Sequence, residues 1–138
     1  MKAPLLLVVL LLTLSTGLHA EPPEQDPIDI AMDKAMEKDP STAGMVQAAA
    51  QADKKWQKEI ERALSSLKKE MTAEQYKALQ ASQQTWKNFR DKEVATQSAL
   101  YGALEGSMWV PVAATKEMDL DRARALLLRD YLEALSAQ

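Results

Sequence analysis

Two consecutive stretches of this chain repeat apolar residues at spacings of three and four, over residues 42–71 and 76–104. This spacing gathers the side chains on one face of a helix, so we predict two long helices, the first from about Thr42 to Glu70. Thr72 begins a capping-box sequence that opens the second helix. Because only a tight turn separates them, the two helices are expected to fold back as an antiparallel hairpin. The stripes are Met45, Ala49, Ala52, Trp56, Ile60, Ala63, Leu67 and Met71, then Tyr76, Leu79, Gln83, Trp86, Arg90, Val94, Gln97, Tyr101 and Leu104.

A shorter helical pattern precedes this hairpin. Asp26 can cap a short helix that Pro27 opens, and Asp39 and Pro40 interrupt it. The apolar side of this short helix is expected to comprise Ile28, Met32 and Ala35.

After the hairpin, residues 106–118 are expected to be irregular, since Pro111 argues against a continuous helix. Gly106 lies where a helix C-terminal glycine belongs, and Asp119 can cap a last helix. The apolar stripe of that last helix would be Leu120, Ala123, Leu127, Tyr131 and Ala134. No strand pattern occurs, so the predicted fold class is all-α: a long-helix hairpin on which a C-terminal helix and a short N-terminal helix pack.

The first twenty residues have the organisation of a secretory signal peptide. Lys2 gives a positive start, residues 4–14 are apolar, and Ala20 ends a plausible cleavage region. The apolar run is shorter than the ~20 residues that a spanning helix needs, which argues against a permanent anchor. We expect cleavage after about Ala20, which leaves residues 21–138 as a single periplasmic or secreted domain without stable membrane insertion.

Several function classes are excluded by missing residue types. The chain has no cysteine, and its one histidine, His19, belongs to the predicted signal peptide. A Ser-His-Asp triad, a Cys-His pair and a Cys/His zinc site are therefore excluded. Carboxylate chemistry remains possible, but the glutamates at 59, 61, 70 and 74 suit exposed helix surface rather than an apolar cleft. We predict no enzymatic activity, no catalytic residues, and neither a cofactor nor a metal site.

The charge balance favours a basic partner over nucleic acid. Without Lys2, 16 basic and 20 acidic side chains remain, which gives a formal charge of −4. Binding to a phosphate backbone needs a concentrated basic face, so no nucleic-acid partner is expected. The sequence predicts no particular oligomeric state.

The register of the predicted hairpin brings polar and aromatic residues together. In an antiparallel pair with this turn, the numbers of facing residues sum to roughly 143, so Asp53 should face Arg90. An arginine on an apolar seam needs a partner, which favours a structural ion pair over a ligand site. Trp56 should lie beside Trp86, where core packing is favoured over a ligand platform.

Trp109 is the best candidate for contact with a partner. A large aromatic side chain beside Met108 and the flexible Gly106-Ser107 is typical of an interface anchor. The alternative is that Trp109 and Val110 fold back to cover the open end of the helices.

From about Ile28 to Leu135 the chain resembles the LprI-type lysozyme inhibitor family of small secreted helical proteins. The resemblance is carried by Ser41-Thr42-Ala43-Gly44-Met45, Ala52-Asp53 with Trp56, Gln83-x-x-Trp86-x-x-Phe89-Arg90-Asp91, Gly106-Ser107-Met108 and Arg122-x-x-x-Leu126. It implies a small helical domain in the bacterial envelope. Many members carry cysteines that look like disulfide partners, whereas this chain has apolar residues where we would expect them, such as Ala35, Ala49 and Val94.

Two functions from different classes follow from these observations. The resemblance implies a lysozyme inhibitor. We nominate residues 106–110 as the segment that blocks the enzyme's cleft, or Arg90 or Arg122 as the group presented to its catalytic carboxylates. The alternative is a non-enzymatic envelope scaffold or stress protein that binds another periplasmic protein through a helix face. An exposed apolar patch away from residues 106–110, or a stable homodimer, would favour the alternative.

Overall fold

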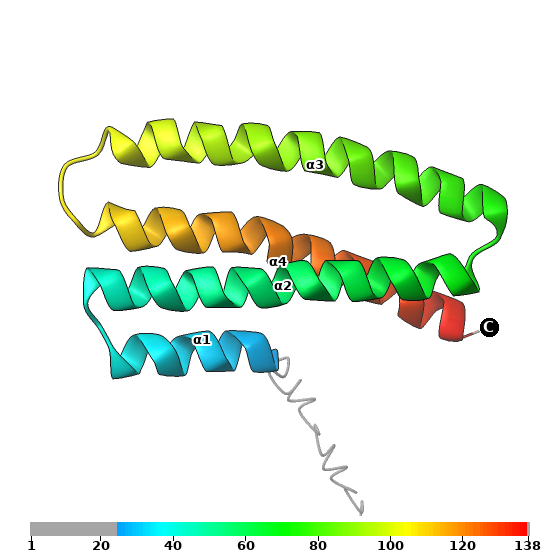
Figure 1. The fold of residues 1–138 in the computed structure, drawn as a ribbon, viewed down its shortest axis with the longest axis horizontal. Helices are drawn as coiled ribbons and strands as arrows, with labels where there is room; N and C mark the ends of the chain where they lie inside the picture. The colour runs from blue at the N-terminus through cyan, green and yellow to red at the C-terminus, as the bar shows by residue number, and fades with distance from the viewer. Residues whose placement is uncertain (1–24, 138) are drawn as a thin grey trace, which may run out of the picture.

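Four helices account for nearly all of the chain that the structure, a computed structural model, describes, which is residues 25–137 (Figure 1). The helices are α1 (Pro27–Lys38), α2 (Thr42–Glu70), α3 (Ala73–Gly102) and α4 (Trp109–Ser136). No strand occurs in the described residues, so the all-α prediction is confirmed. The predicted signal peptide lies outside them. Between residues 25 and 137, no helix combines the length and apolarity that crossing a membrane requires.

The predicted starts of α1 and α3 are confirmed by their capping hydrogen bonds. The Asp26 carboxylate accepts from the Ile28 backbone N–H at 2.8 Å, with Pro27 in the first turn of α1. At the start of α3, the Thr72 hydroxyl accepts from the Gln75 backbone N–H, and the Gln75 side chain accepts from the Thr72 N–H. This reciprocal pair is the predicted capping box, which satisfies two backbone donors that the helix leaves free.

The turn between α1 and α2 depends on a glycine. Ser41 caps α2 by accepting from the Gly44 N–H at 3.0 Å. A Cβ atom at Gly44 would overlap both the carboxyl group and the backbone carbonyl of Asp39. The absence of a side chain at Gly44 therefore lets α2 start directly against the end of α1.

The four helices lie in the spatial order α1, α2, α4, α3 (Figure 1). Helix α4 packs along α2, while α1 packs on the other side of α2 and α3 packs on α4. The expected direct seam between α2 and α3 is therefore wrong over most of its length. The hairpin turn at Met71 and Thr72 is present, but the C-terminal helix takes the position that α3 was expected to fill.

Small side chains on α2 explain why α4 packs so closely against it. Ala48, Ala49, Ala52 and Ala63 are buried on the face that also buries Trp56. Their small volume allows two helix backbones to approach closely and leaves room for the indole. Residues of the predicted α2 stripe that the core includes are Ala52, Trp56, Ile60, Ala63 and Leu67.

The predicted apolar stripe of the last helix is wrong. The face of α4 that is buried contains Met118, Asp121, Arg124, Ala125 and Leu128. The predicted members Ala123, Leu127, Tyr131 and Ala134 are exposed instead, and Leu120 is half-buried. Helix α4 thus has a second apolar face that this chain does not fully cover.

The start of α4 also differs from the prediction. The helix begins at Trp109, ten residues before the expected cap at Asp119. Pro111 is its third residue, where the backbone N–H would have no partner within the helix, so proline is tolerated there. The irregular segment is thereby reduced to residues 103–108.

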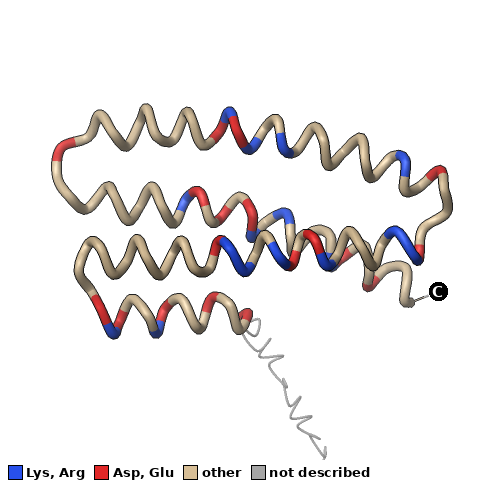
Figure 2. The backbone as a smooth tube through the Cα atoms, in the orientation of Figure 1, with Lys and Arg blue, Asp and Glu red and all other residues tan. Residues whose placement is uncertain are grey.

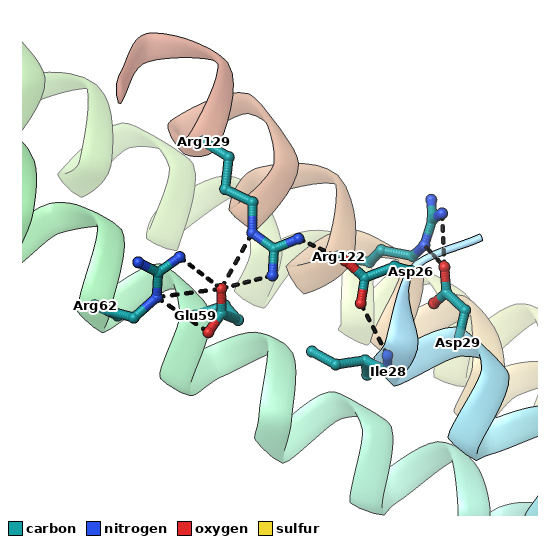
Figure 3. A network of polar contacts seen from close by, with 7 residues as sticks. All are labelled: Asp26, Ile28, Asp29, Glu59, Arg62, Arg122 and Arg129. Carbon is teal, nitrogen blue, oxygen red and sulfur yellow. Dashed lines mark hydrogen bonds and ion pairs between the residues drawn. The ribbon is translucent and has the colours of Figure 1, made fainter. Parts of the chain in front are cut away.

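Arginine side chains fasten α1 to the rest of the fold (Figure 3). Arg129 of α4 donates to Asp26 at 2.5 Å and to Glu59 of α2 at 2.6 Å, so one guanidinium joins α4 and α2 to the start of α1. Glu59 also accepts from Arg62, and these arginines hold the pKa of Glu59 below its usual value against the effect of burial.

Candidate functional site

At the end of the molecule that contains the α3–α4 loop, helices α2, α3 and α4 are almost free of charge. Residues 42–52 contain no Lys, Arg, Asp or Glu, and residues 94–115 contain only Glu105. Figure 2 shows both segments at the same end, with the charged residues of α2, α3 and α4 concentrated further along the helices. We refer to residues 42–52 and 94–115 as the loop end. So few charges on these segments, in a molecule in which 27% of residues are charged, are typical of a contact surface rather than of a solvated face.

Apolar side chains are exposed at this loop end. Leu100, Leu104, Met108 and Val110 are 57%, 40%, 62% and 54% exposed. We call these four residues the loop-end surface. They surround the loop that joins α3 to α4, and exposed apolar side chains gain most when a partner removes them from water.

Trp109 is held against α3 rather than projecting into solvent. Its ring stacks on that of Tyr101, with centroids 6.0 Å apart and planes inclined by 21°. The indole is half-buried, and Gly106 in the preceding loop has a φ of 101°, a conformation that favours glycine. Trp109 therefore covers the end of α3, which is the alternative considered from the sequence, while Met108 and Val110 on either side face solvent.

An apolar hollow lies beside the same loop. Its volume is about 400 Å³. The lining residues are Met36, Met45, Met108, Pro111, Val112, Thr115 and Lys116. Methionine side chains adapt to partners of different shape, so this hollow extends the loop-end surface with a deformable wall.

Arg122 does not belong to the loop end. It lies 13 residues beyond Trp109 on α4, which is roughly 20 Å along the helix. Its guanidinium donates to Asp29 at 2.8 Å and covers the ring of Trp56. The structure thus separates Arg122 from Gly106, Ser107, Met108 and Trp109, with which the sequence analysis had grouped it.

A polar centre joins α2, α3 and α4 in the middle of the molecule. Arg90 donates through Nε to Asp121 Oδ1 and through Nη2 to Asp121 Oδ2, both at 2.8 Å. Asp53 Oδ2 is 3.9 Å from Arg90 Nη2, so the expected pair is present as a longer contact. Gln57 Nε2 donates to Asp53 at 2.8 Å and to Asp121 at 3.1 Å. Asp121, which the sequence analysis missed, is the main partner of Arg90.

The two aspartates of this centre have opposite pKa shifts. Burial, a hydrogen bond with Asp121 and the charge of Asp121 raise the pKa of Asp53 to about 7. Burial acts in the same direction on Asp121, but hydrogen bonds from Arg90, Asp53 and Gln57 outweigh it and lower the pKa of Asp121. As the pH falls, Asp53 is therefore protonated before Asp121.

The two tryptophans expected to lie together contact arginines. Arg122 and Arg129 lie over the ring of Trp56, and Arg124 lies over the ring of Trp86. An open groove of about 330 Å³ separates α2 from α3 at this level. Its lining comprises Gln57, Ile60, Glu61, Leu64, Gln83, Trp86, Lys87, Arg90 and Asp121. Trp56 is a core residue, whereas Trp86 is half-buried at the edge of this groove.

These features define a small all-α domain with an apolar, nearly uncharged loop end and, in residues 25–137, no cluster of metal-ligating side chains. The family model for lysozyme inhibitor LprI matches residues 33–128. The chain belongs to this family, as its sequence motifs indicated.

The chain is also similar to proteins of solved structure. The chain is similar to an uncharacterised protein from Burkholderia thailandensis, whose crystal structure has 31% sequence identity and a TM-score of 0.76. The similarity covers 82% of this chain and 57% of that one, so the chain spans little more than half the length of that relative. No curated protein matches the chain.

Proposed function

We propose that this chain is a non-enzymatic inhibitor of lysozyme that binds the enzyme through its loop-end surface. Two observations support the proposal: the chain belongs to the LprI lysozyme inhibitor family, and Leu100, Leu104, Met108 and Val110 are exposed at an end with almost no charge. The observation that carries the choice of surface is this uncharged end, because burying it against a partner leaves few charges to desolvate.

The distribution of charge supports attraction of a basic enzyme. The formal charge of −3 on the whole chain lies mostly away from the loop end (Figure 2). Charges outside a contact surface accelerate the encounter with an oppositely charged partner without being buried in the complex. The loop of residues 103–108 joins the ends of two long helices, which is a shape suited to entering an open cleft.

We place this activity in the periplasm or outside the cell. The support is the signal-like sequence of residues 1–20 together with membership of the LprI family. Lysozymes act on the cell wall, so an inhibitor must be exported to meet them.

The proposal is tested by titrating animal-type and goose-type lysozymes with the protein purified after export, at low and physiological salt. Met108→Asp and Val110→Asp each place a charge on the loop-end surface and should raise the half-inhibitory concentration at least about tenfold. Phe89→Asp is the matched control, since Phe89 is similarly exposed on α3 away from the loop. Absence of inhibition by the unmodified protein at large excess would refute the proposal.

A second candidate function is an envelope scaffold that binds another periplasmic protein through a helix face. The observation that favours it is the uncovered apolar face of α4, where Leu127 and Tyr131 are exposed and Leu127 lines a pocket together with Phe89 of α3. Pull-down of envelope proteins with the Phe89→Asp and Met108→Asp variants distinguishes the two functions. Partners lost only in Phe89→Asp would identify the helix face as the binding surface.

A further inference from the structure

Arg124 is a buried arginine on the α3-facing side of α4. It is 5% exposed, and its Nε donates to Gln83 Oε1 at 2.8 Å. A second contact, from Nη2 to the Ser82 hydroxyl, is longer at 3.4 Å. Both acceptors are neutral, and the guanidinium also lies 5.8 Å from the ring centre of Trp86.

Arg124 differs from the other arginines of the chain. Arg62, Arg90, Arg122 and Arg129 each have a carboxylate oxygen within 2.9 Å. Within residues 25–137 no carboxylate forms an ion pair with Arg124, although it is the least exposed of the five. Burial lowers the pKa of Arg124, but a guanidinium stays protonated in proteins. The fold therefore contains a buried positive charge without a counter-ion, which is costly unless a partner supplies one.

A pocket gives a partner access to this charge. Its volume is about 270 Å³. The lining residues are Trp86, Phe89, Asp119, Leu120, Ala123, Arg124 and Leu127. Most of the wall is apolar, and it coincides with the second apolar face of α4, which α3 covers only in part. Phe89 and Leu127 are 52% and 40% exposed at its rim.

We propose that this pocket binds an acidic side chain carried between apolar residues on a partner protein. The carboxylate would pair with Arg124, and the flanking apolar side chains would pack on Phe89 and Leu127. Charge complementarity selects the occupant, because a purely apolar group would cover Arg124 without neutralising it. This inference deepens the second candidate function and rests on it, while it is independent of lysozyme binding at the loop end.

Gln83 offers a way to supply the missing charge from within the chain. Because arginine only donates hydrogen bonds, the Gln83 atom that faces Arg124 must be the amide oxygen. Gln83→Glu replaces the amide with a carboxylate of the same shape at this position. It should form an internal ion pair with Arg124 and so compete with a carboxylate from outside.

The test is an NMR titration of the exported protein with two peptides, acetyl-Leu-Glu-Phe-amide and its neutral isostere acetyl-Leu-Gln-Phe-amide. The glutamate peptide should bind at least about tenfold more tightly, with shifts at the Trp86 indole N–H. Gln83→Glu should weaken the glutamate peptide about tenfold and raise Tm by about 4–8 °C. Gln84→Glu is the matched control, because it adds the same charge one residue away on the exposed side of α3 and should change neither quantity beyond about twofold or 2 °C.

A second pair of variants tests the apolar rim of the pocket without altering the hydrogen-bond partners of Arg124. Phe89→Ala should weaken the glutamate peptide severalfold, whereas Leu100→Ala, an equally exposed apolar residue at the loop end, should not. Equal affinity for the two peptides, or undiminished binding by Gln83→Glu, would overturn the proposal. Binding of octanoate without binding of either peptide would overturn it too, since the occupant would then be a small amphiphilic acid. Lysozyme inhibition is measured on Gln83→Glu, Gln84→Glu and Phe89→Ala, which lie outside the loop-end surface, and it should not change. That result separates this test from failure of the loop-end proposal.

Discussion

Arg90 donates hydrogen bonds to both carboxylate oxygens of Asp121 at 2.8 Å, across the interface between α3 and α4. Asp121 is only 1% exposed, so this bidentate pair is shielded from water and from salt. Helix α3 packs on α4 and hardly touches α2, which leaves Arg90 as a principal fastening of α3 to the remaining helices.

Replacing Arg90 with alanine should therefore destabilise the fold strongly. The change leaves Asp121 buried without its cation, a situation that costs about 3–5 kcal/mol in other proteins. Chemical denaturation followed by circular dichroism measures the free energy of unfolding. Lys87→Ala removes a cation one turn away that forms no ion pair within residues 25–137, and it should cost less than about 0.5 kcal/mol. An equally small loss for Arg90→Ala would mean that the pair does not stabilise α3.

Stability should fall as the pH rises from about 4 to about 7. The pKa of Asp53 is 3.8 in the unfolded chain and about 7 in the fold, so between these values the folded state binds more protons. Under that condition the free energy of unfolding decreases with rising pH, by roughly 1–3 kcal/mol over the interval. Asp121 and Glu59, whose pKa values are lowered, affect stability at lower pH. There they stabilise the fold while ionised, and this stabilisation is lost as they become protonated.

Asp53→Asn is the control for this pH effect. The amide keeps a group that can donate to Asp121 but does not ionise, so the decrease between pH 4 and 7 should disappear. Denaturation midpoints of the unmodified protein and of Asp53→Asn, measured at three pH values between 4 and 7, check this prediction. A decrease that persists in Asp53→Asn would assign the effect to another group.

Local patterns were sufficient to predict most of the secondary structure. The starts of α1, α2 and α3 follow from caps that act within four residues, such as Thr72 with Gln75. The buried face of α2 follows from its spacing, because an apolar stripe of this length can only face a core. The start of α4 was predicted too late because the effect of proline depends on its position. Proline breaks the interior of a helix, but it is tolerated in the first turn, where Pro111 lies.

The arrangement of the helices was harder to predict, because two helices compete for the same face of α2. Its alanines suit a close neighbour but do not say which one, and α4 fills the place expected for α3. For the same reason Asp121 and Arg124 were missed, since both lie among the apolar residues Met118, Ala125 and Leu128. The sequence signal for Asp121 is a polar residue at helical spacing among the apolar residues of α4, available to pair with Arg90 of α3.

Gly44 and Gly102 should respond to alanine substitution in opposite ways. Gly44→Ala brings a methyl group into Asp39 and should cost about 1–3 kcal/mol, against the usual helical preference for alanine. A Cβ at Gly102 has no atom within 4 Å, so Gly102→Ala should be neutral or stabilise by up to about 1 kcal/mol. Thermal unfolding of the two variants checks the difference. A stabilising Gly44→Ala would show that the α1–α2 turn moves freely.

Trp109→Ala should loosen the loop without unfolding the protein. Trp109 is half-buried and stacks on Tyr101, so its loss should cost about 1–3 kcal/mol. Amide hydrogen exchange of residues 103–108 should accelerate, while circular dichroism stays helical. Because Met108 and Val110 flank Trp109, a looser loop must be reordered on binding, and lysozyme inhibition should weaken several-fold. Tyr101→Phe keeps the stacked ring and should leave both exchange and inhibition unchanged. Full inhibition by Trp109→Ala would show that the order of this loop is not required for binding.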